Sequence, residues 1–433
     1  MKICMMTNTY LPHVGGVARS VSTFAEEYQR LGHEVLVVAP EFDGKPLPAR
    51  AEAMVERIPS LRNFNGSDFS VRLPLAAALS DRIDAFRADI IHAHHPFLLG
   101  DTALRIAMNK NVPIVFTHHT RYEDYTHYVP FSDTMKEVAT EIPTHFANLC
   151  DGVIAPSESL ARILRKRGVT TPITIIPTGI DVQAFGSADG RAFRAKQKIP
   201  ADTYVVGHVG RLAQEKNLGF LANAVALYLQ QHDKARFLVV GDGPSRAEFE
   251  AVFEEHGVRD QLLLAGKRTG RALREAYRAM DLFVFASQSE TQGMVVAEAM
   301  AAGLPVVALN ASGVREVVSD GKNGFLLPAT ATPQQMAEVL AQVAADPAEA
   351  RKLSVGALAT AQEFSRERSA LRALALYEEI RRATRARRLM HQLHPWTALV
   401  QRLGLEWDLL SSRTQTVAAA VFGDEKEMAV KVS

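Results

Sequence analysis

Cysteine is scarce in this sequence, which has only Cys4 and Cys150 among its 433 residues. Two cysteines so far apart cannot build the disulfide framework of a small secreted domain, so we expect reduced thiols and a cytoplasmic protein. Apolar runs of the roughly 20 residues that a membrane-spanning helix needs are also missing. The N-terminal MKICMMTNTYLP contains a short apolar run that breaks at Thr7. We interpret it as a first β-strand and not as a signal peptide.

An excess of charge of one sign is missing too. The formal net charge is +1, which argues against nucleic acid as a partner. The chain contains no Asp-x-Asp pair of the kind that presents a divalent metal to a nucleotide diphosphate. Histidines gather at residues 92–97 and 117–130, but without the spacing of zinc ligands. We therefore predict no metal and no cofactor, and interpret these segments as a cleft wall with an acceptor-facing histidine and aromatic side chains.

Complete dinucleotide fingerprints are also missing, because the glycines of TYLPHVGGVARS and GDGPSR do not form G-x-G-x-x-G. This disfavours a nicotinamide enzyme. The two glycines of the first segment precede an expected helix over 17–31. There a glycine such as Gly16 would let a ligand approach the backbone closely. Double glycines are also common in ordinary turns.

The sequence does contain two series of short apolar segments that alternate with amphipathic ones. The first includes KICMMTN, EVLVVAP, ADIIHAHH, VPIVFTHH and DGVIAPS, and the second includes YVVGHVGRL, ARFLVVGDGP, QLLLAGKRT, DLFVFASQSE and PVVALN. This pattern predicts an α/β fold with two doubly wound parallel sheets, each covered by helices. The segment 174–193, rich in Pro, Gly and Asp, is the expected hinge. We place the domains at 1–180 and 181–364, followed by a helix and a basic tail over 365–433.

A pair of glutamates, Glu290 and Glu298, occurs eight residues apart in SETQGMVVAEAM. A strand precedes them, and a helix from 293 to 302 is expected to end at Gly303. Amides at the start of that helix could bind a phosphate, and the two carboxylates could accept hydrogen bonds from sugar hydroxyls. A helix cap at Glu290 and a solvated Glu298 would be the structural alternative.

Two cations, Arg211 and Lys216, occur in GRLAQEKN directly after the first strand of the second series. In parallel sheets ligands bind beyond the carboxyl ends of the strands. Arginine and lysine at that position could hold a diphosphate. The alternative is a solvated charged loop in which Glu215 pairs with one of the two bases.

Taken in order, these motifs resemble the retaining GT-B glycosyltransferases of family 4, from the first strand to about residue 385. RLGHEV, PTGIDVQAF, GRLAQEKN, GDGP and the E-x7-E motif carry the resemblance. It implies two Rossmann-like domains that face a cleft, the first for the acceptor and the second for a nucleotide-sugar. The residues that it implies for the donor site are Arg211 and Lys216 on the diphosphate, Gly16 from the other domain, Glu298 on the ribose, Glu290 on the sugar, the amides of Gly293, Met294 and Val295 on the phosphates, and His119 near the reacting carbon.

The acceptor expectation comes from IIHAHHPFLLG and HTRYEDYTHYVP, which look like the subset of this family that glucosylates diacylglycerol. The expected reaction transfers a hexose, with UDP-glucose as donor, to such a lipid. The arginine-rich segment 381–388 and an apolar stripe after it, which includes Trp396 and Trp407, suit an anionic membrane surface. The stripe could equally pack on the first domain.

Other functions remain open at this point. Within the same class, the donor could be GDP-mannose or another nucleotide-sugar, and the acceptor soluble or polyprenyl-linked. A nucleotide-sugar epimerase would use the same two-domain architecture without an acceptor. A non-catalytic nucleotide-sugar-binding subunit is disfavoured because Glu290, Arg211, Lys216 and His119 are all present.

Overall fold

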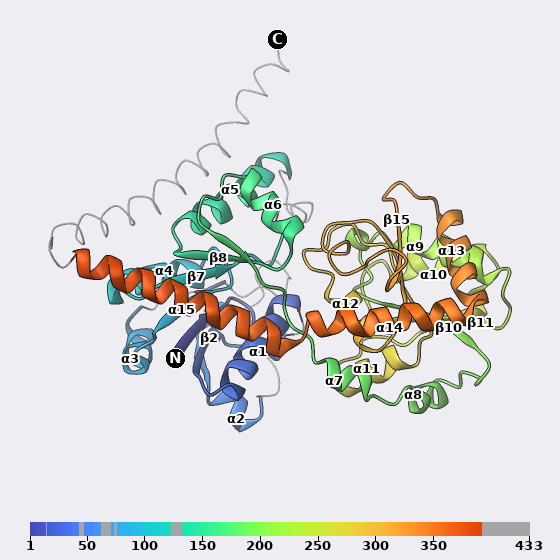
Figure 1. Ribbon diagram of the computed structural model, residues 1–433, viewed down its shortest axis with the longest axis horizontal. Coiled ribbons are helices and arrows are strands. Elements are labelled where there is room, and N and C mark those ends of the chain that lie inside the picture. The colour runs from blue at the N-terminus through green and yellow to red at the C-terminus, as the bar shows by residue number, and fades with distance from the viewer. Residues whose placement is uncertain (14, 43–46, 62–70, 73–75, 123–131, 392–433) are drawn as a thin grey trace, which may run out of the picture. The chain divides into compact units, whose positions relative to one another are not determined.

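The computed structural model describes residues 1–13, 15–42, 47–61, 71–72, 76–122 and 132–391 (Figure 1). The chain forms two compact units, the first made of Met1–Pro177 with Ser369–Ser433 and the second of Thr178–Arg368. The expected boundaries at 180/181 and 364/365 lie three and four residues from these. None of the described helices combines the length and the apolarity that crossing a bilayer would require.

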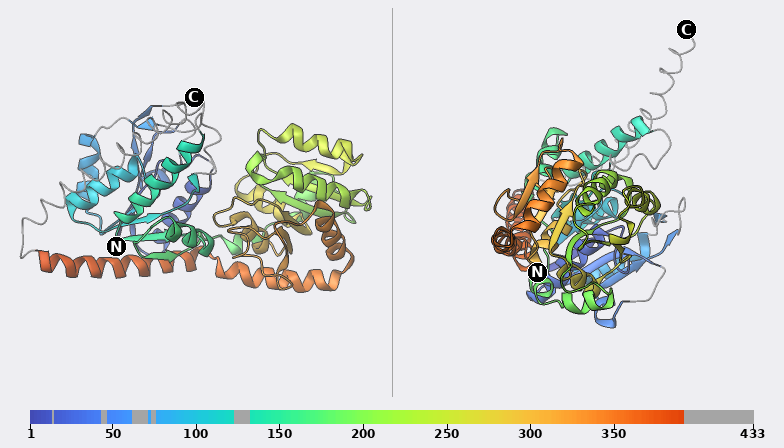
Figure 2. Two further views of the ribbon diagram at one scale, coloured as in Figure 1. Left: turned by 90° about the horizontal axis from the view of Figure 1, so that it is seen from above. Right: turned by 90° about the vertical axis from the view of Figure 1, so that its right-hand side faces the viewer.

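The first unit contains a seven-stranded parallel sheet in the order β3-β2-β1-β6-β7-β8-β9. Its strands are β1 (Lys2–Met6), β2 (Glu34–Pro40), β3 (Val55–Ile58), β6 (Ile90–Ala93), β7 (Ile114–Thr117), β8 (Gly152–Ala155) and β9 (Ile173–Ile175), and β4 (Ser60–Leu61) pairs with β5 (Val71–Arg72) in a separate antiparallel ribbon. The helices are α1 (Gly16–Arg30), α2 (Ala49–Glu52), α3 (Ala76–Phe86), α4 (Leu99–Lys110), α5 (Ser132–Asn148), α6 (Glu158–Lys166) and the long α15 (Arg366–His391), as Figure 2 shows from two further sides.

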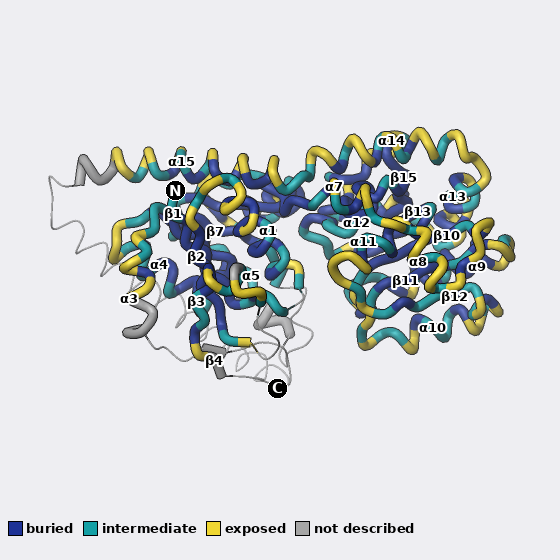
Figure 3. Tube along the Cα trace, turned by 90° about the horizontal axis from the view of Figure 1, so that it is seen from below, coloured by how far each residue is buried: buried dark blue, intermediate teal, exposed yellow. Residues whose placement is uncertain are grey.

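Residues of β1 point alternately to the two faces of this sheet, and each face is covered. Cys4 and Met6 pack into one apolar cluster, whereas Ile3 and Met5 pack into the other. The second cluster includes the buried face of α15, to which Tyr377 belongs. Figure 3 shows α15 alternating between buried and exposed residues along its length. The returning helix therefore belongs to the core of the first unit.

The second unit contains a six-stranded parallel sheet in the order β12-β11-β10-β13-β14-β15. Its strands are β10 (Tyr204–Val209), β11 (Ala235–Val240), β12 (Leu262–Leu264), β13 (Leu282–Phe285), β14 (Val306–Leu309) and β15 (Gly324–Leu327). Its α-helices are α7 (Val182–Gly186), α8 (Gly190–Lys196), α9 (Leu218–Leu229), α10 (Arg246–Glu255), α11 (Gly270–Arg278), α12 (Met294–Ala301), α13 (Pro333–Ala345) and α14 (Pro347–Glu363), with short 3-10 turns η3 (Gln214–Lys216) and η4 (Arg259–Gln261).

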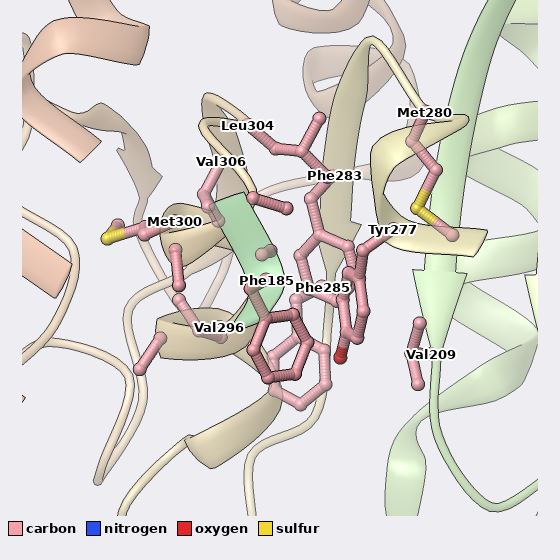
Figure 4. Packing of buried hydrophobic residues seen from close by; sticks show 14 of the residues in the cluster. Phe185, Val209, Tyr277, Met280, Phe283, Phe285, Val296, Met300, Leu304 and Val306 are labelled. Carbon is pink, nitrogen blue, oxygen red and sulfur yellow. The ribbon is translucent and has the colours of Figure 1, made fainter. Parts of the chain in front are cut away.

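Apolar clusters cover both faces of this sheet as well. In one of them, Phe283 and Phe285 of β13 pack beside Tyr277 of α11 and Val296 of α12 (Figure 4). The opposite cluster is formed largely by α9 and α13 against β10 and β11. Because α11 and α12 share a core, Tyr277 and α12 are held in a fixed relation to each other.

The expected doubly wound parallel sheets are confirmed, and several local details agree with the sequence. The expected helix over 17–31 is α1, and Gly32, with a φ of +84°, follows it in the left-handed region. EVLVVAP forms β2 from end to end. Cys4 and Cys150 are free and buried, and burial raises the pKa of the Cys4 thiol to about 12. The tail stripe with Trp396 and Trp407 lies outside the described residues.

Candidate active site

The E-x7-E segment joins β13 to α12 through a loop that is held tightly in place. Gly293 caps α12 with a φ of +73°, so the helix begins at Met294, one residue later than expected. A Cβ on Gly313 would lie 2.8 Å from the Gln292 nitrogen, so only a glycine lets the loop after β14 pack this closely. The amides at the start of α12 have no intrahelical acceptor. Their partial positive charge makes this end of the helix suitable for an anion.

Lys216 and Glu290 form an ion pair at this edge of the sheet. The Lys216 Nζ donates to Glu290 Oε1 at 2.6 Å, and the two side chains are only 19% and 17% exposed. Lys216 ends the turn η3 that follows β10, and Glu290 follows β13. Because β10 and β13 are neighbours in the sheet, their carboxyl ends bring together two residues that lie 74 positions apart in the sequence.

Arg211 lies at the same edge, and its side chain is exposed. The loop that carries it packs on the GDGP turn. Leu212 donates its amide to the Asp242 carbonyl at 3.1 Å, and its own carbonyl accepts from the Ser245 amide at 2.9 Å. A Cβ on Gly243 would lie 2.2 Å from the Leu212 carbonyl oxygen. The glycines of GDGP thus serve close packing of the loop that holds Arg211.

Glu298 is fully buried, which corrects the alternative of a solvated surface residue. It lies in the middle of α12, and its Oε2 accepts a hydrogen bond from the Tyr277 hydroxyl at 2.9 Å. The same hydroxyl lies 3.3 Å from the Val295 carbonyl oxygen. A buried carboxylate needs such partners because burial of an unpaired charge is costly. Its contact with a ribose stays a prediction.

Gln292, between the two glutamates, ties the loop to the start of the second unit. Its buried carboxamide accepts from the Thr178 amide at 2.8 Å and donates to the Thr178 carbonyl at 2.8 Å. Two residues after Thr178, the Ile180 amide donates to the Phe364 carbonyl at 2.8 Å. The loop of Glu290 is therefore fixed to the hinge segment through one side chain.

Several buried polar atoms at this edge have no hydrogen-bond partner within the part of the chain that the structure describes. They are His208 Nε2 at the end of β10, Ser287 Oγ after β13, and Asn310 Oδ1 and Ser312 Oγ after β14. Unpartnered polar atoms are unusual in protein interiors, and their presence at one sheet edge is typical of a site for a polar ligand. His208 donates from Nδ1 to the Val284 carbonyl at 3.2 Å, and burial lowers its pKa to about 4.

The two remaining candidate residues, Gly16 and His119, belong to the first unit. Gly16 opens α1, and among the described residues no atom outside its own helix turn lies within 4 Å of the position that a Cβ would take. His119 follows β7 and is partly exposed. Its Nε2 lies 2.9 Å from His94 Nδ1. Burial, and then the neighbouring histidines, lower the pKa of His119 well below 6.5, so the ring is neutral at neutral pH.

The described residues include no group of three His, Cys, Asp or Glu side chains arranged to hold a metal ion. The structure adds three residues that the sequence reasoning did not single out, Tyr277, Gln292 and His208, and it selects His94 from the histidine-rich segment 92–97. Of these, His208 has a visible signal, because it is a polar residue inside the apolar run YVVGHV. Nothing local in the sequence marks the partners of Tyr277 and Gln292, since both act through long-range contacts.

Known proteins are similar to this chain in sequence and in fold. Residues 14–184 match the model of Glycosyltransferase Family 4, and residues 189–358 match that of Glycosyl transferases group 1. The GDP-mannose-dependent alpha-mannosyltransferase of Mycobacterium tuberculosis is 31% identical over 333 residues, which cover 76% of this chain and 84% of that protein. The chain belongs to glycosyltransferase family 4. This family 4 protein is accordingly a glycosyltransferase, as the sequence predicts.

Two further comparisons concern lipid synthesis and the fold. The alpha-monoglucosyldiacylglycerol synthase of Acholeplasma laidlawii is 29% identical to this family 4 chain over 341 residues, which cover 75% of the chain and 84% of that protein. The crystal structure of Anabaena Alr3699/HepE in complex with UDP and glucose matches with a TM-score of 0.69 at 22% identity, over 88% of this chain and 100% of that one. The likeness in structure establishes the GT-B fold.

Proposed function

We propose that this protein is a retaining glycosyltransferase that moves a hexosyl group from UDP-glucose to a lipid acceptor such as diacylglycerol. The observation that carries the donor site is the Lys216–Glu290 pair beside the open end of α12. The acceptor proposal is supported by the relative named for monoglucosyldiacylglycerol synthesis. The UDP and glucose bound to the structural neighbour favour the same donor.

In this proposal the donor lies along the carboxyl edge of the second unit's sheet. Arg211 and Lys216 bind the diphosphate, and the amides of Gly293, Met294 and Val295 add hydrogen bonds to its oxygens. Lys216 then shares its charge between the diphosphate and Glu290, which contacts the sugar. Glu298, oriented by Tyr277, accepts hydrogen bonds from the ribose hydroxyls. The family resemblance also implies roles in donor binding for Gly16 and His119, which belong to the first unit.

The chemical step breaks the bond between the anomeric carbon and the diphosphate oxygen. Negative charge grows on the leaving diphosphate, and two cations and the helix amides stabilise it without a metal ion. The acceptor hydroxyl attacks from the face that the diphosphate leaves and passes its proton to the departing diphosphate oxygen, so configuration at the anomeric carbon is retained. His119 contacts the donor sugar near that carbon. Its depressed pKa keeps it neutral, so it adds a hydrogen bond and not a positive charge.

A second candidate donor is GDP-mannose. It is favoured by the M. tuberculosis relative, whose name specifies that donor and whose identity to this chain is similar. Both candidates use the same diphosphate-binding residues, because the diphosphate is common to them. The discrimination between the two must come from the base and the sugar.

The experiment that tests the function is a screen of donors against acceptors with the purified full chain. UDP-glucose and GDP-mannose are each incubated with diacylglycerol in mixed micelles, with water-soluble saccharides and without acceptor, and products are identified by mass spectrometry. We expect a hexosyl-diacylglycerol product and acceptor-dependent release of UDP, with an α-linkage by NMR. Nucleotide release at the same rate with and without acceptor would contradict the proposal. Unchanged rates in EDTA are expected, and loss of activity that Mg²⁺ restores would refute the metal-free step.

We also propose that the enzyme works at the cytoplasmic face of a membrane. Arg381 forms ion pairs with Asp89 at 2.8 Å and with Glu378 at 2.9 Å, whereas Arg385, in the last two turns of α15, is exposed. Arg385 and the residues after 390 are the proposed contact with anionic lipid. Deletion of residues after 390 should lower sedimentation with anionic liposomes and leave UDP binding unchanged. Equal sedimentation of both forms would remove the support for this contact.

A further inference from the structure

Three histidine rings lie in a row that ends at His119. The ring centroids of His92 and His94 are 4.0 Å apart with an interplanar angle of 40°, and those of His94 and His119 are 5.2 Å apart with an interplanar angle of 24°. His92 is 1% exposed and His94 is 0% exposed, whereas His119 is partly exposed. His119 is thus the outer member of the row, and His94 lies between His119 and the buried His92.

The inner end of the row, His92, is held by a hydrogen-bond network that involves three elements. His92 Nε2 lies 2.6 Å from Thr117 Oγ1, and His92 Nδ1 lies 2.6 Å from the Tyr377 hydroxyl of α15. The Tyr377 hydroxyl lies 2.9 Å from that of Tyr28 in α1. With both of its nitrogens engaged, His92 cannot rotate, and its face fixes the plane against which His94 packs.

His94 has one side-chain hydrogen bond, between its Nδ1 and His119 Nε2 at 2.9 Å. Its other nitrogen, Nε2, is buried without a partner in the part of the chain that the structure describes. A neutral imidazole carries one proton, on either nitrogen. If the proton were on Nε2, a buried N–H would have no acceptor, which costs about 1–3 kcal/mol and is rare in proteins. With the proton on Nδ1, the N–H is used in the bond to His119, and Nε2 is left as a buried acceptor without a donor, which is less rare in proteins than a buried N–H without an acceptor.

The proton on His94 Nδ1 also determines which nitrogen of His119 is protonated. The bond between the rings needs one donor, so when His94 Nδ1–H donates, His119 Nε2 accepts. A neutral His119 must then carry its own proton on Nδ1. Burial and the neighbouring imidazoles lower the pKa of both rings well below 6.5, so neither is an imidazolium at neutral pH.

We propose that His94 is a positioning residue, which donates from Nδ1 to His119 Nε2 and thereby fixes His119 as the Nδ1–H tautomer. His119 then meets the donor with an N–H, and the ligand group that it recognises is an oxygen of a sugar hydroxyl or of the phosphate. It has no lone pair free for proton abstraction, because Nε2 is occupied and Nδ1 is protonated. The proposal rests on the proposed function for the ligand, but the proton placement itself does not depend on any ligand.

The proton placement is tested by ¹⁵N NMR of the histidine-labelled protein at neutral pH, without ligand. Long-range ¹H–¹⁵N correlations distinguish the two neutral tautomers, and spectra of His94→Leu and His119→Ala assign the two rings. We expect protonated Nδ1 and unprotonated Nε2 in both rings. A protonated Nε2 on His119 would overturn the proposal. This measurement decides the matter even if no nucleotide-sugar is consumed, so it separates this proposal from the proposed function.

The positioning role is tested by three substitutions at His94 in the full chain. Asn places an amide N–H near the former Nδ1, Leu removes the donor, and Asp can only accept. Loss of a preorganised donor contact costs about 10²–10³ in rate at other active sites. We expect about a hundredfold fall in kcat for Leu and Asp, recovery to within about tenfold for Asn, and unchanged UDP affinity in all three. Unchanged kcat in His94→Leu, or equal loss in Asn and Leu, would overturn the role.

His33→Leu is the matched control for these variants. His33 is a partly exposed histidine of the same unit, and its Nδ1 lies 3.0 Å from the N-terminal amine. It directly precedes β2, at the amino end of the sheet, whereas His119 follows the carboxyl end of β7. We expect wild-type kcat in His33→Leu. An equal loss in this variant and in His94→Leu would mean that histidine replacement disturbs the unit generally, and would overturn the specific role.

Discussion

Replacement of Lys216 by methionine separates the structural role of the Lys216–Glu290 pair from its catalytic role. Removal of one partner of a buried ion pair costs roughly 3–5 kcal/mol, because the other charge stays buried. Here the side chains are 19% and 17% exposed, so water screens part of that cost, and we expect about 2 kcal/mol. The loss of the cation at the leaving diphosphate should lower kcat about 10²–10³-fold, equal to roughly 2.7–4 kcal/mol.

The double variant with Glu290→Gln is the decisive comparison. Without the carboxylate, no uncompensated charge is buried, so the stability of the second unit should return to within about 1 kcal/mol of wild type. The turnover should not return, because the diphosphate still lacks Lys216. Stability is measured by hydrogen exchange of the β10 and β13 amides, since the two units can unfold separately. Turnover is measured as acceptor-dependent UDP release.

Two outcomes would refute this reasoning. Normal turnover in Lys216→Met would mean that Lys216 does not stabilise the leaving diphosphate. Recovery of turnover in the double variant would mean that Lys216 acts only by neutralising Glu290. Lys234→Met is the matched control, because Lys234 pairs with Asp202 at 3.2 Å with side chains 83% and 68% exposed. Its loss should leave both stability and turnover unchanged.

Two further predictions concern contacts that the structure adds. Glu298→Ala should raise the dissociation constant for UDP about tenfold or more by calorimetry, because hydrogen bonds to a charged group contribute roughly 1.5–3 kcal/mol. Tyr277→Phe keeps the carboxylate and should raise the dissociation constant less. Equal UDP binding by wild type and Glu298→Ala would contradict the ribose contact. Tyr377→Phe removes a hydroxyl that bonds to His92 and Tyr28, and should destabilise the first unit by about 1–3 kcal/mol in denaturant unfolding. An unchanged denaturant midpoint would show that these short hydrogen bonds contribute nothing to the stability of the first unit.

Much of the fold could be predicted from the sequence because its signals are local. Buried parallel strands appear as short apolar runs, and EVLVVAP and LFVF form β2 and β13 where those runs occur. Gly303, with a φ of +78°, follows α12 as expected for a glycine after a helix. The rule that ligands bind at the carboxyl ends of strands then selected the loops of Arg211, Lys216 and Glu290.

The sequence could not reveal which side chains orient these residues. Gln292 reaches Thr178 across 114 positions, and His94 reaches His119 across 25 positions. Nothing in the local pattern of either partner specifies the other, because the contact exists only once the sheet order is fixed. The burial of Glu298 was missed for a related reason. Its position in α12 faces α11, and the sequence does not specify which helices share a core.

Each residue with a proposed role in chemistry, apart from Arg211 and Gly16, is held by a contact that exists without a ligand. Lys216 holds Glu290, Tyr277 holds Glu298, and His94 holds His119. A group whose orientation is set before binding does not pay reorganisation energy when charge develops in the transition state. Arg211 is the exception, since its side chain is exposed and its guanidinium must become ordered on the diphosphate. The loss of side-chain conformational entropy on donor binding should therefore come mainly from Arg211. Lys216, Glu290, Glu298 and His119 should keep their apo orientations when UDP binds.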